Sequence, residues 1–198
     1  MSTRIIVPHR GLAVAKTRLA PVLDHEERIA LARTLLVRVL GAARQAADDV
    51  VVISPSAELE PIVAEAGARL AVQHGMGLNA GLDEARAAAV VEGVQRLAVL
   101  HGDLPNLQAD DVRALLDSAA VARAVAIAPD RLGTGTNGLA LNPPAVIGFH
   151  FGTGSFEAHR TDAHAADLEP AIVSRAGLAF DLDTPEDLAR WLELGSAA

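Results

Sequence analysis

The stretch Leu97-Ala98-Val99-Leu100-His101-Gly102-Asp103-Leu104-Pro105 decides the fold. Its first four residues form a short apolar run, which is typical of a buried central strand in a parallel sheet. The strand leads to an acid, and Leu104-Pro105 then turns the chain away from strand geometry. Ligands of open α/β sheets bind at the carboxyl ends of the strands, so Asp103 is well placed to bind a metal. The simpler alternative is an aspartate in a turn that hydrogen-bonds its own backbone. Considered by itself, Asp103 fits this alternative better.

Composition restricts the class of protein. The 198 residues fit a single domain spanning residues 1–198, with enough chain to bury a substantial core. The sequence has no cysteine, which excludes disulfides, thiolate metal sites and thiol nucleophiles. The net charge of −8 argues against general nucleic-acid binding. We see no signal peptide and no apolar run of membrane length, so we expect a cytoplasmic protein without a membrane partner.

Short apolar runs alternate with helical patterns along the chain. Residues 4–8, 50–53 and 69–72 read as the first three strands. Asp24 caps a long helix between the first two, and Glu27 stands at the capping-box position. This alternation predicts an α/β fold, a doubly wound and mostly parallel sheet flanked by helices.

A basic loop follows the first strand. Arg10, Lys16 and Arg18 lie within nine residues of one another, together with Gly11 and Thr17. The loop matches neither the dinucleotide fingerprint nor the P-loop, which removes the best local support for an oxidoreductase or a kinase. By spacing alone, a solvated basic face and a phosphate-binding loop fit equally well.

Three glycine-rich segments offer backbone donors or sharp turns. Residues 75–79 enter a helix for which Asn79 is a good N-cap, and a nucleotide beside this helix start or a plain capped helix both fit. Residues 132–138 hold three glycines and favour an anion site over a flexible turn. Residues 149–156 open a helix with Ser155 as the expected N-cap. The nearby histidines do not form a recognised zinc motif, so we expect structural or solvent roles.

An acidic segment completes the pattern. Asp181 and Asp183 alternate on a predicted strand, so both point to the same side. Thr184 caps the last helix, and Asp187 is expected to belong to that acidic cap. Two like charges on one side repel unless a cation lies between them. Because Asp103 supplies a third carboxylate from another strand edge, we favour a Mg²⁺ site over a cap for this pair.

Six segments, taken in order, resemble one known family. They are Ala15-Lys16-Thr17-Arg18-Leu19, Gly77-Leu78-Asn79-Ala80, Gly102-Asp103-Leu104-Pro105, Gly133-Thr134-Gly135-Thr136-Asn137, Phe151-Gly152-Thr153-Gly154-Ser155-Phe156 with His159, and Asp181-Leu182-Asp183-Thr184-Pro185-Glu186-Asp187-Leu188. The chain resembles the 2-phospho-L-lactate/phosphoenolpyruvate guanylyltransferases of coenzyme F-420 biosynthesis over nearly its whole length. The resemblance implies a nucleotide-diphospho-sugar transferase-like fold, with a mixed sheet flanked by helices.

The resemblance also implies a reaction, which moves GMP from GTP to the phosphate of a three-carbon phosphoacid and releases pyrophosphate. Its implied site residues fall into three groups. The metal ligands for Mg²⁺ are Asp103, Asp181 and Asp183, the nucleotide-binding residues are Arg10, Lys16, Arg18, Gly77 and Asn79, and the phosphoacid-binding residues are Thr136, Gly152 and Ser155. Asp103, Lys16 and Arg18 are the expected catalytic residues. His101 departs from the family, where a small residue is commoner, and this changes the polarity of the site or its choice of acid.

Several alternatives stay open. Phosphoenolpyruvate is favoured as acceptor, because residues 130–136 look like the bacterial branch of the family, with 2-phospho-L-lactate and 3-phospho-D-glycerate as alternatives. A nucleotidyltransferase with a sugar phosphate or molybdopterin acceptor is another alternative. Such an enzyme is expected to have a glycine-rich loop after the first strand, and this sequence lacks that loop. A non-catalytic nucleotide-binding regulator has no need of three strand-edge acids, and a small-molecule oxidoreductase is a more distant alternative. The oligomeric state is open, with a homodimer allowed.

Overall fold

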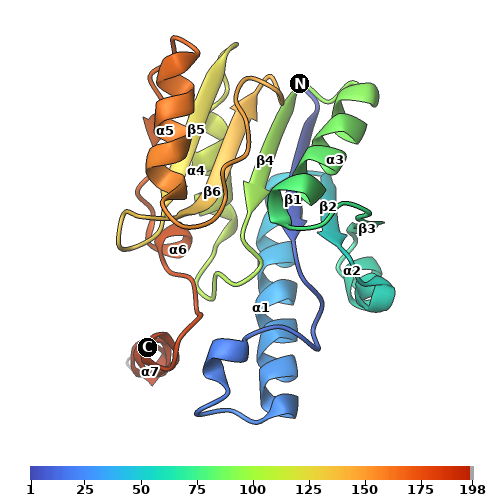
Figure 1. Ribbon diagram of the computed structural model, residues 1–198, viewed down its shortest axis with the longest axis vertical. Helices are drawn as coiled ribbons and strands as arrows, with labels where there is room; N and C mark the ends of the chain where they lie inside the picture. Colours follow the sequence, from blue (N-terminus) through green and yellow to red (C-terminus); the bar gives the residue numbers. More distant parts are fainter. Residues whose placement is uncertain (197–198) are drawn as a thin grey trace.

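The computed structural model describes residues 1–196 and contains a seven-stranded sheet (Figure 1). The strand order is β3-β2-β1-β4-β6-β5-β7, and the first four strands in this order are parallel. β6 is antiparallel to both β4 and β5, while β7 is parallel to β5. The strands are β1 (Thr3–Pro8), β2 (Asp49–Ser54), β3 (Arg69–Val72), β4 (Arg96–Leu100), β5 (Ala124–Pro129), β6 (Thr136–Asn142) and β7 (Ala171–Ile172). The predicted mixed, mostly parallel sheet is confirmed.

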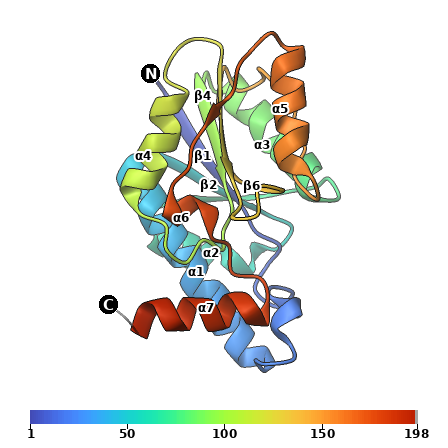
Figure 2. The same ribbon diagram turned by 90° about the vertical axis from the view of Figure 1, so that its left-hand side faces the viewer.

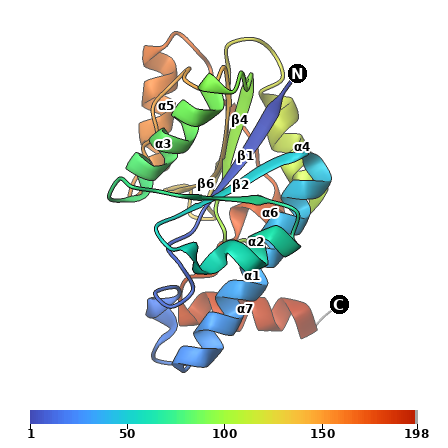
Figure 3. The same ribbon diagram turned by 90° about the vertical axis from the view of Figure 1, so that its right-hand side faces the viewer.

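Helices cover both faces of this sheet. α1, α2 and α4 lie on one face, and α3 and α5 lie on the other (Figures 2 and 3). Each face has its own cluster of buried aliphatic side chains, because central strands are apolar on both sides. The helices are α1 (His25–Ala46), α2 (Glu60–Glu65), α3 (Leu78–Val91), α4 (Ala109–Ser118), α5 (Ser155–Ala165), α6 (Ala176–Ala179) and α7 (Pro185–Ser196), with 3-10 turns η1 (Thr17–Leu19) and η2 (Ala57–Leu59). Within residues 1–196 we find no helix with the length and apolarity needed to cross a membrane.

A third apolar cluster joins the two ends of the chain. Leu19 of η1, Leu35 of α1 and Leu182 before α7 are fully buried against one another. Trp191 packs on this cluster from α7, which lies across the first half of α1 (Figure 2). The cluster therefore holds the basic loop after β1 close to the acidic segment at residues 181–183.

The structure confirms one of the helix caps expected from the sequence and corrects two others. The Asp24 cap is confirmed: the backbone N–H of Glu27 donates to Asp24 Oδ1 at 2.9 Å, and the backbone N–H of Asp24 donates to Glu27 Oε2 at 2.8 Å. Asn79 is not the cap of α3, because Gly77 takes that place with φ 94°. Ser155 is not the cap of α5, because Gly154 precedes the helix with φ 74°. Glycine adopts such left-handed backbone without steric cost, which favours it where these loops enter helices.

The acidic segment also differs from expectation. Residues 181–183 form no strand and instead run as extended loop before α7. The predicted cap at Thr184 is confirmed, since its hydroxyl oxygen accepts from the backbone N–H of Asp187 at 3.3 Å and its own backbone N–H donates to Asp187 Oδ2 at 2.8 Å. Asp187 also pairs with Arg131 at 2.7 Å. Contacts of the Asp187 side chain with Thr184 and Arg131 hold the end of this loop, which has no hydrogen bonds of a β-sheet within residues 1–196.

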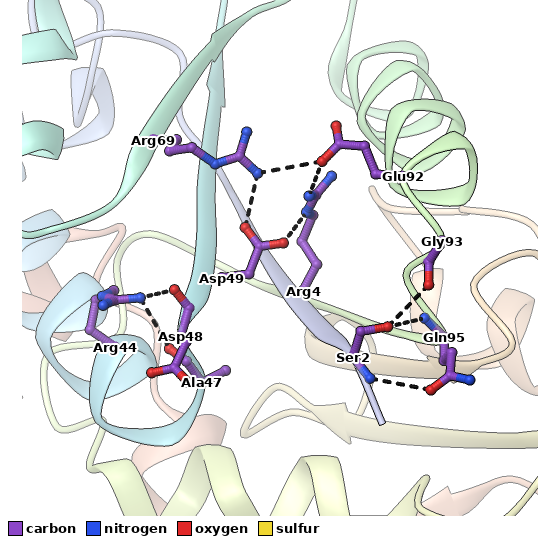
Figure 4. Close-up of polar contacts among 10 residues, drawn as sticks. All are labelled: Ser2, Arg4, Arg44, Ala47, Asp48, Asp49, Arg69, Glu92, Gly93 and Gln95. Atoms are coloured by element: carbon purple, nitrogen blue, oxygen red, sulfur yellow. Dashed lines mark hydrogen bonds and ion pairs between the residues drawn. The ribbon is translucent and has the colours of Figure 1, made fainter.

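A charge cluster around the buried Arg4 joins several elements at the opposite end of the sheet (Figure 4). Arg4, which is 4% exposed at the start of β1, pairs with Asp49 at 2.7 Å and with Glu92 at 2.6 Å. Arg69 extends the group through a 2.9 Å contact with Asp49. This charge cluster joins β1, β2, β3 and the residue after α3 at the edge where the parallel strands begin.

Candidate active site

A buried lysine lies between two acids at the carboxyl end of β4. Lys16 Nζ is 2.8 Å from Asp103 Oδ2 and 2.9 Å from Asp183 Oδ1. The Lys16 side chain is only 6% exposed. Its backbone has φ 54°, a left-handed conformation that costs a residue with a side chain about 1 kcal/mol or more. Such a residue persists because its surroundings hold it, and here the two carboxylates do so.

The charges in this group stabilise one another. Burial alone would raise the pKa of Asp103, but the neighbouring Lys16 ammonium, with His101 and His9, lowers it overall. Burial would likewise lower the pKa of Lys16, whereas Asp103 and Asp183 together raise it. Asp103 is therefore a carboxylate and Lys16 an ammonium at neutral pH. Arg18 adds a more exposed cation, with one guanidinium nitrogen 3.6 Å from Asp183 Oδ2.

Asp181 stands beside this group without a cation of its own. Burial, followed by the charges of Asp103 and Asp183, raises the pKa of Asp181. Its side-chain partner is Asn137, whose Nδ2 donates to Asp181 Oδ1 at 3.3 Å. The backbone N–H of Leu182 donates to the carbonyl oxygen of Asp103 at 3.1 Å, which fixes the acidic segment against the end of β4. The three acids named from the sequence are thus at one edge of the sheet.

These acids suit a hard cation, although their arrangement includes Lys16. Asp103 Oδ1 is buried and has no hydrogen-bond partner among residues 1–196. Carboxylate oxygens are the ligands that Mg²⁺ prefers. In the described part of the chain, no group of three or more acidic, histidine or cysteine side chains is arranged to hold a metal ion. The role of Asp103, Asp181 and Asp183 as metal ligands remains a prediction.

The three residues assigned to the phosphoacid gather where β6 begins and α5 starts. Thr136 and Ser155 are 1% and 2% exposed, and only Gly152 is open to solvent. The backbone N–H of Ser155 donates to the carbonyl oxygen of Gly152 at 3.1 Å, which fixes the turn before α5. Thr136 and Ser155 therefore lie below the protein surface at this place, while Gly152 lies at the surface.

The buried His159 holds the side chain of Thr136 in place. The backbone N–H of His150 donates to His159 Nε2 at 3.0 Å, and His159 Nδ1 is 3.0 Å from Thr136 Oγ1. Burial and the nearby His150 lower the pKa of His159 to about 4, so the ring is neutral at pH 7. Because Nε2 accepts a hydrogen bond from the backbone N–H of His150, the ring proton is on Nδ1, which donates a hydrogen bond to Thr136 Oγ1. This matches the expected structural role of His159.

The glycine-rich loop between β5 and β6 is organised by Asp130. The backbone N–H groups of Leu132, Thr134 and Gly135 donate to its carboxylate at 3.1, 2.9 and 2.9 Å. The interpretation of these N–H groups as free anion donors is therefore wrong, because they already have an acceptor. An aspartate two residues before a turn is the sequence signal for such a loop, and it identifies Asp130 as the residue that the motif analysis missed.

Of the expected nucleotide-binding residues, Arg10 and Gly77 are exposed beside the loops that they belong to. Asn79 has a different task. Its Oδ1 accepts from the backbone N–H of Phe151 at 2.9 Å, and its Nδ2 donates to the carbonyl oxygen of Phe151 at 3.0 Å. These two hydrogen bonds connect the start of α3 to the segment before Gly152. They occupy both polar atoms of the Asn79 side chain, which are then not available to hydrogen-bond a nucleotide base.

Sequence comparison with known proteins identifies a family. A family model described as "Guanylyl transferase CofC like" matches residues 3–197. A phosphoenolpyruvate guanylyltransferase from Rubrobacter xylanophilus is 41% identical over 194 residues, covering 96% of this chain and 93% of that protein. Another from Sphaerobacter thermophilus is 42% identical over 191 residues, covering 95% and 91%. A 2-phospho-L-lactate guanylyltransferase from Methanothermobacter thermautotrophicus is 34% identical over 189 residues, covering 95% and 83%.

The fold is also found in solved structures. A crystal structure from Desulfovibrio desulfuricans, provisionally described as a nucleotide-diphospho-sugar transferase, superposes with a TM-score of 0.82 at 23% identity. The superposition covers 98% of this chain and 88% of that one. At this identity the likeness concerns the fold, and it confirms the expected nucleotide-diphospho-sugar transferase-like architecture.

Proposed function

Because the chain belongs to the CofC-like guanylyl transferase family, we propose that it transfers GMP from GTP to the phosphate of phosphoenolpyruvate and releases pyrophosphate. The two relatives above 40% identity carry the name phosphoenolpyruvate guanylyltransferase, which supports this acceptor over 2-phospho-L-lactate. The observation that carries the proposal is the group of acids around the buried Lys16. Asp103, Asp181 and Asp183 carry more negative charge than Lys16 balances, which suits a divalent cation that brings two polyanionic substrates together. On the same grounds we place the reaction in coenzyme F-420 biosynthesis.

The basic loop after β1 receives the triphosphate. Arg10 and Arg18 are exposed and offer guanidinium groups that pair well with phosphate. Lys16 is the innermost cation of this loop and lies beside Asp103, where the reacting α-phosphate must come. The nucleoside extends toward Gly77 at the start of α3. Asn79 acts there as a positioning residue through its hold on Phe151.

Asp103, Asp181 and Asp183 hold Mg²⁺ in this proposal. The unpartnered Asp103 Oδ1 and the raised pKa of Asp181 both indicate negative charge that Lys16 does not fully balance. Mg²⁺, when bound, neutralises charge that develops on the α-phosphate and on the leaving pyrophosphate. Lys16 shares carboxylate oxygens with that site, so its ammonium is free to turn toward phosphate once another cation takes its place.

The acceptor binds next to Thr136, Gly152 and Ser155. One of its phosphate oxygens attacks the α-phosphorus, a new P–O bond forms, and the bond to the β-phosphate oxygen breaks. The electron pair of the broken bond leaves with pyrophosphate. Such a displacement needs in-line positioning and charge neutralisation more than proton transfer. The attacking phosphate is already an anion, which fits a site whose closest histidine, His159, is buried, neutral and occupied in hydrogen bonds.

The test is a competition among acids. The protein is incubated with GTP, Mg²⁺ and phosphoenolpyruvate, 2-phospho-L-lactate or 3-phospho-D-glycerate, while pyrophosphate release and product mass are followed. We expect the highest kcat/KM with phosphoenolpyruvate, and a product heavier than the acid by one GMP unit. ATP in place of GTP tests the choice of base. If none of the three acids releases pyrophosphate, the chain is a nucleotide-binding protein without this activity.

A further inference from the structure

Two polar side-chain atoms at the carboxyl end of β4 are buried without a partner. They are Asp103 Oδ1, assigned above to the cation, and His101 Nε2, for which residues 1–196 offer no hydrogen bond. An unsatisfied buried polar atom destabilises a protein, so a folded chain keeps one where a ligand or water completes its hydrogen bonds. We propose that His101 determines acceptor specificity by donating a hydrogen bond from Nε2 to the carboxylate of the phosphoacid, an inference that rests on the proposed function.

The ring of His101 lies on the acceptor side of the site. Its backbone N–H donates to the carbonyl oxygen of Asn137 at 3.0 Å, and Asn137 directly follows Thr136. Its ring centroid is 5.5 Å from that of Phe151, which directly precedes Gly152. Both contacts are thus to sequence neighbours of the residues assigned to the phosphoacid. Neither contact is to the basic loop that receives the triphosphate.

The ring of His101 packs against a neighbour that is itself held in place. Phe151 is itself fixed, because Asn79 holds its backbone at two points and the edge of its ring packs against His159 at 4.9 Å between centroids. His101 packs against this fixed ring at an angle of 39° between the two planes. A donor held this way is preorganised, so little side-chain entropy is lost when the ligand binds.

In this proposal His101 Nε2 donates to the carboxylate of the phosphoacid and not to its phosphate. The reacting phosphate has to approach the α-phosphate beside Asp103 and Lys16. His101 stands two residues before Asp103, and its ring packs against Phe151, the residue before Gly152. A three-carbon phosphoacid has one other anionic group, its carboxylate. An N–H donor to a carboxylate is stronger than one to a neutral acceptor.

A donor at a fixed place discriminates by geometry. In phosphoenolpyruvate and 2-phospho-L-lactate the carboxylate is bonded to the carbon that carries the phosphate. In 3-phospho-D-glycerate one more carbon separates the two groups. When the phosphate is fixed by the reaction centre, a carboxylate that reaches His101 in the first two acids is displaced in the third. His101 therefore favours 2-phosphoacids over 3-phosphoacids.

Two substitutions at His101 test this role. His101→Phe keeps a ring against Phe151 and removes the donor, whereas His101→Gln keeps an N–H donor. His164→Phe, on the exposed side of α5 where His164 pairs with Glu169, is the matched control. For each variant we measure KM for the acid and for GTP, binding of phosphoenolpyruvate alone by calorimetry, and the midpoint of thermal unfolding.

For His101→Phe we expect KM and Kd for phosphoenolpyruvate to rise about 10-fold or more, the loss typical of a hydrogen bond to a charged group. KM for GTP stays within about twofold, and the preference for phosphoenolpyruvate over 3-phospho-D-glycerate shrinks. The unfolding midpoint stays level or rises, because an unpaired buried polar atom has been removed. His101→Gln recovers part of the acid affinity, and His164→Phe changes none of these quantities.

The failures are distinguishable. A wild-type protein that turns over none of the acids contradicts the proposed function itself. An active wild type whose acid KM is unchanged in His101→Phe overturns the role of His101, and so does a variant in which KM for GTP rises equally. If His101→Phe does not fold, His101→Gln decides, since an acid affinity reduced more than 10-fold despite a retained donor also contradicts the proposal.

Discussion

Acidification tests the buried pair of His159 and Thr136. Burial lowers the pKa of His159 from 6.5 to about 4. Below pH 6.5 the unfolded chain therefore binds a proton that the folded protein still excludes, and stability falls as the pH falls. The loss begins near pH 6.5 and is complete below about pH 4. At about 1.4 kcal/mol per pH unit, this single ring lowers the free energy of unfolding by about 3 kcal/mol across that window.

The assay is urea unfolding of wild type and His159→Phe at several pH values between 7 and 4. At pH 7 the variant is less stable by about 1–3 kcal/mol, because the backbone N–H of His150 and the hydroxyl of Thr136 each lose a partner. That difference shrinks by about 3 kcal/mol as the pH approaches 4, since the variant has no ring to protonate. His25→Gln, at the exposed start of α1, is the control for loss of a histidine from the surface. A constant difference for His159→Phe would refute the reasoning.

Three further substitutions have separate readouts. Asp103→Asn lowers kcat at saturating Mg²⁺ by about 100-fold or more, the effect of removing one electrostatic element from a reaction centre, while Asp110→Asn on α4 leaves kcat unchanged; near-normal turnover of the first would contradict its role. Arg4→Met lowers the free energy of unfolding by about 2 kcal/mol in urea, because the buried cation of the charge cluster is lost, and the exposed Arg69→Met costs under about 1 kcal/mol. Equal losses would show that burial of Arg4 contributes nothing. Asp130→Ala speeds amide hydrogen exchange in residues 132–135, and unchanged exchange would contradict the organising role of Asp130.

The sequence predicts those features that depend on neighbouring residues. The apolar run before His101 identifies β4 because a buried parallel strand is apolar on both faces. The Asp24 and Glu27 pair identifies the start of α1 because a capping box is complete within four residues. The sequence also predicts that Asp103 meets Asp181 and Asp183, but as two strand ends at one edge of the sheet. In the structure residues 181–183 are a loop, fixed there by the hydrogen bond from the Leu182 N–H to the carbonyl oxygen of Asp103.

What the sequence does not predict depends on contacts between distant residues. Asn79 reads as a helix cap, and its actual partner is the backbone of Phe151, 72 residues away. The Asp181 segment alternates like a strand, but no neighbouring strand pairs with it in residues 1–196, and the buried Leu182 holds it in place instead. The exchange of charge between Lys16 and the two acids likewise brings together segments as far as 167 residues apart.

The central claim is that acids from two distant segments bind one divalent cation where two anions meet. A crystal grown with GTP and Mn²⁺ tests this most directly, because the anomalous scattering of manganese locates the ion independently of the protein. The account predicts a manganese peak bonded to carboxylate oxygens of Asp103, Asp181 and Asp183 and to a phosphate oxygen, with Lys16 Nζ moved from the acids toward the triphosphate. A bound triphosphate whose manganese touches none of these three acids would contradict it.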